Sequence, residues 1–168
     1  MGYTVSKVLN SNPDSLSTAA DEAGAGATRV GENMATQRKY LENLAEDWSG
    51  GTAAEAAQKQ GTDMLTDQAA YKTKLEKLKA ALSSGAQKLR DRRSELKAAV
   101  DDAEVWWNVA DDGSVKPGWA LAAWAELSQV NWFEVENKRI ANEQKIKLIL
   151  AQFEAQDEAT AYEVRKLG

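Results

Sequence analysis

Cysteine and histidine are both absent from this chain of 168 residues, and proline occurs only twice. Without a thiol or an imidazole the chain has no means of forming a disulfide, a cysteine or histidine zinc site, or a Cys–His or Ser–His catalytic arrangement. Paired carboxylates such as Asp157 and Glu158 have no surrounding pocket that the sequence indicates. We therefore predict that the protein is not an enzyme and holds no metal ion or other cofactor.

Long apolar runs are also missing, since no stretch approaches the ~20 apolar residues that a membrane-spanning helix needs. The first residues, MGYTVSKVLNSNPDS, carry one lysine and no apolar segment of the length of a signal-peptide core. The sequence predicts a soluble protein without a cleavable export signal. Its location is then the cytoplasm, or the cell envelope or exterior by a secretion route that accepts folded helical cargo.

The charge is modest, at −5 overall, and does not indicate a nucleic-acid-binding chain. Residues 72–97 are nevertheless basic, with nine Lys or Arg against three acids, and a basic helix can bind phosphates. Residues 12–48 hold seven acids against three bases, so pairing between the two segments is the simpler explanation. We predict no nucleic-acid partner.

A first long helix is predicted over about residues 13–48. Asn12 suits the cap, Pro13 the first helical position, and Asp14 the positive end of the helix dipole. From there small and apolar residues recur in steps of three and four as far as Trp48. Such a stripe indicates that one face of the helix is covered by a neighbour.

A tight reversal follows, because Ser49, Gly50 and Gly51 provide the backbone freedom that a helix C-terminus requires. Thr52, with Glu55 three residues later, predicts a capped second helix over about residues 52–106. Its apolar stripe includes Met64 and Tyr71, and residues 83–85 (Ser-Ser-Gly) are the expected place for a bend or for the end of the contact with the first helix. A connection this short makes the two helices antiparallel neighbours.

The segment VWWNVADDGSVKPGW, residues 105–119, interrupts the helical pattern. Asp112-Gly113 predicts a tight turn between short apolar segments, and Pro117-Gly118 a second turn, so we expect a small hairpin or turn insertion at about residues 108–118. A third helix is predicted over about residues 120–167. The sequence thus predicts an all-α, elongated antiparallel helical hairpin, extended to a three-helix bundle, in one domain comprising residues 1–168.

The aromatic residues around this insertion allow two interpretations. In the first they form a small local core that pins the third helix onto the second. In the second they form an exposed patch that binds a partner module or, more weakly, a membrane surface. The residues concerned are Trp106, Trp107, Trp119, Trp124 and Trp132, with Phe133 beside them.

The reversal at Trp48-Ser49-Gly50 lies between two long amphipathic helices, with Glu46 and Asp47 before it and small residues after it. In these features the chain resembles the WXG-motif proteins, which are substrates of type VII (ESX) secretion in actinobacteria and related bacteria. Its opening segment and its insertion further resemble the long WXG-like N-terminal domains of larger secreted toxins and hydrolases. The resemblance implies a helical hairpin that is exported folded.

The resemblance also implies partners and a recognition site. Expected partners are the type VII apparatus or a chaperone, and a WXG-type protein in a homo- or hetero-oligomer. The family's export mark joins the WXG turn, here Trp48 and Gly50, to a tyrosine followed four residues later by an acid. Tyr162 is followed at that spacing by Lys166, so we expect Trp48, Gly50 and Tyr162 to form a surface that a partner or downstream residues complete. The alternative function is an intracellular coiled-coil scaffold or adaptor.

Overall fold

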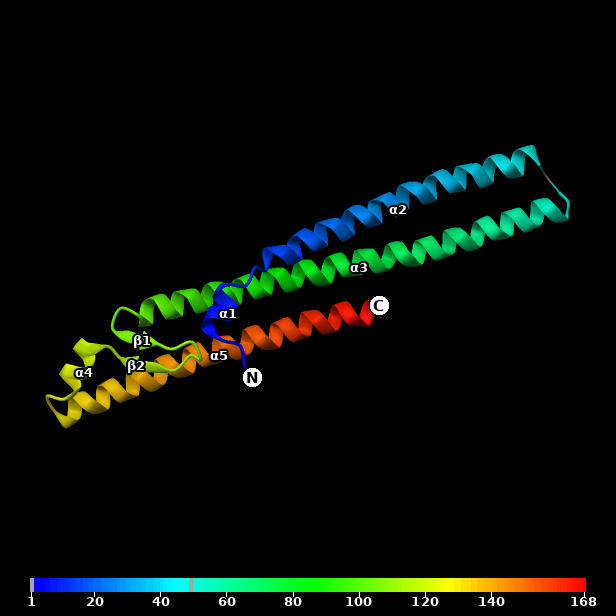
Figure 1. Ribbon diagram of the computed structural model, residues 1–168. Helices are drawn as coiled ribbons and strands as arrows, with labels where there is room; N and C mark the ends of the chain where they lie inside the picture. The colour runs from blue at the N-terminus through cyan, green and yellow to red at the C-terminus, as the bar shows by residue number, and fades with distance from the viewer. Residues whose placement is uncertain (1, 49) are drawn as a thin grey trace. The chain divides into compact units, whose positions relative to one another are not determined.

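The computed structural model describes residues 2–48 and 50–168, and over these the protein is all-α apart from one pair of short strands. Contacts divide the chain into two compact units. Unit 1 comprises Met1–Ser15 and Ser84–Tyr162, and unit 2 comprises Leu16–Ser83 and Glu163–Gly168. The elements, labelled in Figure 1, are α1 (Val5–Leu9), α2 (Asp14–Asp47), α3 (Thr52–Ala103), β1 (Trp107–Val109), β2 (Val115–Pro117), α4 (Trp119–Ala125) and α5 (Gln129–Leu167).

Unit 2 is an antiparallel hairpin of α2 and the first part of α3 (Figure 1). Small residues on α2 face long side chains on α3, with Gly24 against Lys79 and Gly31 against Lys72. Nearer the turn the small residue is on α3 and the large one on α2, because the side chain of Leu41 packs on Gly61. Ala20, Ala23, Ala27 and Met34 of the predicted stripe are buried. The helices approach closely because almost no bulky side chain separates them.

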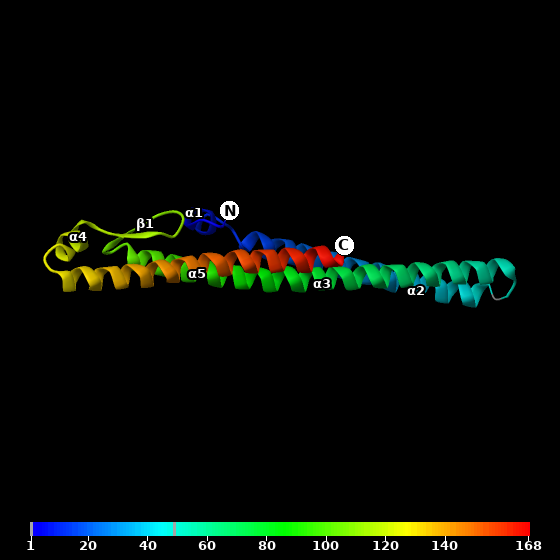
Figure 2. The same ribbon diagram turned by 90° about the horizontal axis from the view of Figure 1, so that it is seen from below.

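Unit 1 pairs the second part of α3 with α5, and both views show these helices side by side (Figures 1 and 2). At one place the backbones come very close, since a Cβ atom at Gly85 would lie 2.6 Å from the Oγ1 atom of the buried Thr160. Larger side chains fill the rest of the interior. The largest fully buried side chains are those of Leu96, Ile146, Val8 and Val115.

The strand pair and α1 lie on the same side of α5 (Figure 2). β1 and β2 are antiparallel, and their register places Trp107 opposite Pro117 and Val109 opposite Val115. The turn between them contains Gly113 with a φ of 90°, a conformation that favours glycine. The N-terminal segment is bound to this turn, because the backbone N–H of Val5 donates to the Asp111 carbonyl at 2.8 Å. The predicted insertion is therefore a two-stranded hairpin.

The first two predicted helices agree with α2 and α3 to within a few residues. The third does not run unbroken, because α4 ends at Ala125 and α5 begins at Gln129. Ser128 caps the new helix by accepting from the backbone N–H of Asn131 at 3.1 Å, and the side chain of Asn131 donates to the carbonyl of Trp124 at 3.0 Å. The short helix α1 was not predicted.

One finer prediction about the second helix is wrong, because Met64 and Tyr71 are exposed rather than part of the inward stripe. α3 is assigned as one helix through residues 83–85, where a bend or the end of the first helix's contact is expected. The boundary between the two units falls between Ser83 and Ser84. The glycine at position 85 allows close packing against Thr160.

We expect Gly85→Ala to destabilise unit 1 by about 1–2 kcal/mol, because overpacking outweighs the roughly 1 kcal/mol that alanine gains in a helix. Thr160→Ala removes the two nearest atoms of the facing side chain, so the double variant should recover most of the loss. Denaturant unfolding measures both. Gly26→Ala is the matched control, since its nearest contact would be an ordinary 3.4 Å, and it should not destabilise. A stabilising Gly85→Ala would contradict the close packing.

The phenol of Tyr3 donates a hydrogen bond to Asp157 and its ring lies 5.9 Å from that of Phe153. The hydrogen bond to Asp157, then partial burial, raises the pKa of Tyr3 from 10.0 to about 12. A raised pKa means that the stabilisation is complete below about pH 10 and is lost as the pH rises towards about 12. Unfolding measured across this range should show a loss in the native protein that Tyr3→Phe lacks. Equal pH dependence of the two proteins would contradict the contact.

Candidate interaction surfaces

Trp48 lies at the turn between α2 and α3, near two glycines whose backbone conformation other residues rarely adopt. α2 ends at Asp47, and the Trp48 N–H still donates to the Leu44 carbonyl at 2.8 Å. Gly50 and Gly51 have φ values of 87° and 93°, in the left-handed region. Ser49, the middle residue of the predicted motif, lies outside the described residues. The turn thus ends one helix and starts the next within a few residues, as predicted.

The Trp48 side chain is 51% exposed, so about half of its surface is covered by the hairpin and half is accessible. Its ring borders a shallow hollow of about 400 Å³ in unit 2, lined by Ala45, Trp48, Gly50, Ala54, Glu55 and Gln58. Other residues close the hairpin beneath it. Ala54 is buried, and the Gln58 amide donates to the Leu41 carbonyl at 3.1 Å across the two helices. The hairpin end is therefore held together by contacts that do not need the indole.

Tyr162, the third residue of the predicted surface, belongs to unit 1, whereas Trp48 and Gly50 belong to unit 2. It is 62% exposed near the end of α5. Two residues earlier, Thr160 packs on Gly85 of α3, within unit 1. The structure describes no single site that contains all three residues, and their joint role stays a prediction.

Four of the five tryptophans around the insertion are exposed. Trp106, Trp119, Trp124 and Trp132 are all exposed, Trp119 to 87%, and Phe133 stacks edge-on against Trp132 with ring centroids 5.3 Å apart. The local-core interpretation is wrong for these residues. Trp107 is the exception, since it is only 7% exposed. The exposed-patch interpretation is therefore wrong for Trp107. It points inward because the neighbouring positions of a strand face opposite sides.

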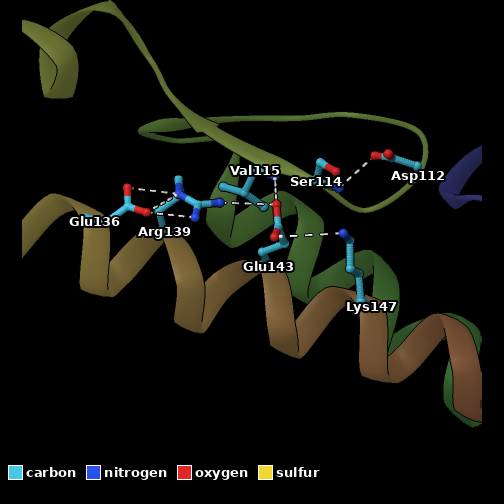
Figure 3. Close-up of polar contacts among 7 residues, drawn as sticks. All are labelled: Asp112, Ser114, Val115, Glu136, Arg139, Glu143 and Lys147. Atoms are coloured by element: carbon cyan, nitrogen blue, oxygen red, sulfur yellow. Dashed lines mark hydrogen bonds and ion pairs between the residues drawn. The ribbon is translucent and has the colours of Figure 1, made fainter.

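A polar cluster fixes the hairpin to α5 (Figure 3). The carboxylate of Glu143 accepts from the backbone N–H of Val115 at 3.0 Å and from Arg139 at 3.3 Å. Arg139 also donates to Glu136 at 2.8 Å, and this hydrogen bond holds the pKa of Glu136 below its ordinary value. On the turn, the N–H of Ser114 donates to Asp112 and lowers the pKa of that carboxyl. These contacts give the elements around the tryptophans a defined place on α5.

Comparisons of the chain with known protein families, with curated proteins and with solved structures found no match. The resemblance to WXG-motif proteins therefore depends on the residues of the turn and the two helices that flank it.

The described residues contain no group of three or more Asp and Glu that could hold a metal ion. None of the helices in the described ranges is long and apolar enough to cross a membrane.

Basic residues of the stretch 72–97 form ion pairs both within α3 and with another helix. The ion pairs Lys72–Glu76, Arg92–Glu95 and Lys97–Asp101 are spaced three or four residues apart on α3. Arg90 reaches α2, at 3.1 Å from Asp14. The predicted pairing between helices is thus accompanied by pairing along α3.

We expect acrylamide to quench most of the tryptophan fluorescence strongly. Five of the six tryptophans are exposed, and only Trp107 is buried, so one small, blue-shifted and poorly quenched component should remain. Stern–Volmer titration of the native protein and of Trp107→Phe checks this, because the substitution should remove that component. Weak quenching of most of the signal would show that the aromatic residues are covered.

Proposed function

We propose that this protein is a non-enzymatic helical domain of the type VII secretion route, which serves as an export-targeting and protein-interaction module. The observation that carries the proposal is the half-exposed Trp48 near Gly50, at the turn between two long antiparallel helices. This is the arrangement expected for the WXG turn. A large, half-exposed aromatic side chain suits recognition, because its ring offers a wide apolar face with a polar N–H.

The position of Trp48 in its unit supports recognition over a purely structural role. The helices are held by Leu41 on Gly61 and by the hydrogen bond from the Gln58 amide to the Leu41 carbonyl, and neither contact involves the indole. The hollow beside the ring is lined by three small residues together with Glu55 and Gln58, so that a partner side chain can enter next to the ring. The proposed partners are the secretion apparatus or a chaperone and a second WXG-type chain, and the proposed destination is the cell envelope or exterior.

We expect Trp48→Ala to reduce export far more than folding. Loss of a fully buried tryptophan costs ~3–5 kcal/mol, and a half-exposed one should cost about half of that. Export is measured as the ratio of protein in the medium to protein in cells, in a host with an active ESX apparatus and in its apparatus-deficient derivative. Thermal unfolding of the purified variants measures the folding effect.

Trp119→Ala is the matched control, because it removes another exposed tryptophan and should leave export unchanged. Normal export of folded Trp48→Ala would contradict the proposal. Retention of the native protein in the cytosol of both hosts would favour the scaffold or adaptor function instead.

A further inference from the structure

Several large apolar side chains of unit 1 are exposed where α3 ends, α4 runs and α5 begins. Figure 1 shows these three segments at one end of the unit. Single exposed apolar residues are ordinary on a soluble protein, whereas a group of them marks a docking surface. We call this group the aromatic patch. Its members are Trp106, Trp119, Trp124, Leu127, Trp132 and Phe133, all of them exposed.

The aromatic patch is held in a defined conformation. The N–H of Gly118 donates to the Trp106 carbonyl at 2.9 Å, which fixes the start of α4 beside the end of α3. The side chain of Asn131 donates to the Trp124 carbonyl, which fixes the end of α4 to the first turn of α5. A surface that is ordered before binding loses less conformational entropy when it is covered.

Acidic residues border the aromatic patch in each of its three segments. Glu104 precedes Val105 and Trp106, Glu126 precedes Leu127, and Glu134 follows Phe133. All three carboxylates belong to exposed residues, and none has an ion-pair partner within 4.0 Å among the described residues. Residues 104–134, from the first of these acids to the last, contain five acids and one lysine, a net charge of −4. The segments that carry the patch therefore combine exposed aromatic side chains with an excess of acids.

This charge distribution disfavours two otherwise plausible occupants. An anionic membrane attracts basic segments, and an acidic edge is repelled by it. A second copy docked through the same patch would bring the acids of both copies together, which costs free energy. A partner with basic residues around an apolar surface has the complementary charge, which speeds encounter and fixes orientation while the aromatic contacts supply affinity.

We propose that the aromatic patch is a docking site for a protein segment that presents apolar side chains flanked by Lys and Arg, such as a basic amphipathic helix. The patch belongs to unit 1, whereas Trp48 belongs to unit 2. The docking proposal does not depend on the proposed export function. Leucine-type side chains of the partner contact the indoles, and its basic groups meet Glu104, Glu126 and Glu134.

The test uses the whole 168-residue chain and a synthetic amphipathic peptide with a leucine face edged by lysines. Fluorescence anisotropy of the labelled peptide measures binding, and a peptide with Glu in place of Lys is the comparison. We expect the Lys peptide to bind, more tightly at low salt, and the Glu peptide to bind at least ~tenfold more weakly. Trp119→Ala with Trp132→Ala should weaken binding by ~tenfold or more.

Charge variants separate local attraction from net charge. Glu104→Lys, Glu126→Lys and Glu134→Lys together should weaken binding and remove its salt dependence. Reversal of Asp21, Glu22 and Asp67 in unit 2 changes the net charge equally and should leave affinity within about twofold. Tyr40→Ala with Tyr71→Ala is the corresponding control for exposed aromatic residues. Circular dichroism confirms that each variant is folded.

Three results would overturn the proposal. The first is a failure of the binding test: either the native chain does not bind the Lys peptide, or the patch variants bind it as tightly as the native chain does. The second is a shift of tryptophan emission with phosphatidylcholine or phosphatidylserine vesicles that Trp119→Ala abolishes, which would assign the patch to a lipid surface. The third is a dimer that the same substitution dissociates, which would assign it to a second copy.

Discussion

The close approach of long helices across alanine and glycine is the constraint on which both units depend. In unit 2 the small residues of α2 lie against lysine and leucine side chains of α3, and Gly61 admits Leu41. In unit 1 Gly85 allows Thr160 to be buried against α3. Interfaces of this kind bury little apolar area per residue, so they need length, and both α3 and α5 are unusually long.

Because the helices pack through small residues, most of the aromatic side chains are exposed at the surface. Trp107 is the one tryptophan in the interior, where the hairpin covers α5. Trp48 is half-exposed near Gly50, and Trp119 is almost entirely exposed on a short helix. The same residue type is thus buried in one element and exposed in others. Partner binding is the role that we propose for the exposed rings.

Much of the secondary structure was predictable, because the signals that place helix ends are local. Pro13, the glycine pair after Trp48 and Thr52 specify the ends of α2 and the start of α3 through backbone conformation and capping alone. The break after α4 was missed although Ser128 is an ordinary capping residue. It lies inside a continuous apolar pattern, which outweighed one serine, and α1 was missed because five residues carry too little periodicity.

Which aromatic residues are buried depended on tertiary structure. Trp106 and Trp107 are neighbours in a sequence that treats them alike, but Trp107 is the first residue of β1 and is buried, whereas Trp106 precedes the strand and is exposed. The paired strand β2 is held through Val115 by Glu143, which is 28 residues away along the chain and carries no local signal of its role. The sequence by itself determined an all-helical chain with a glycine turn at Trp48, since helix caps, apolar spacing and glycine content act over a few residues. Only the tertiary structure decided which tryptophans are available to a partner, because exposure depends on what distant segments cover.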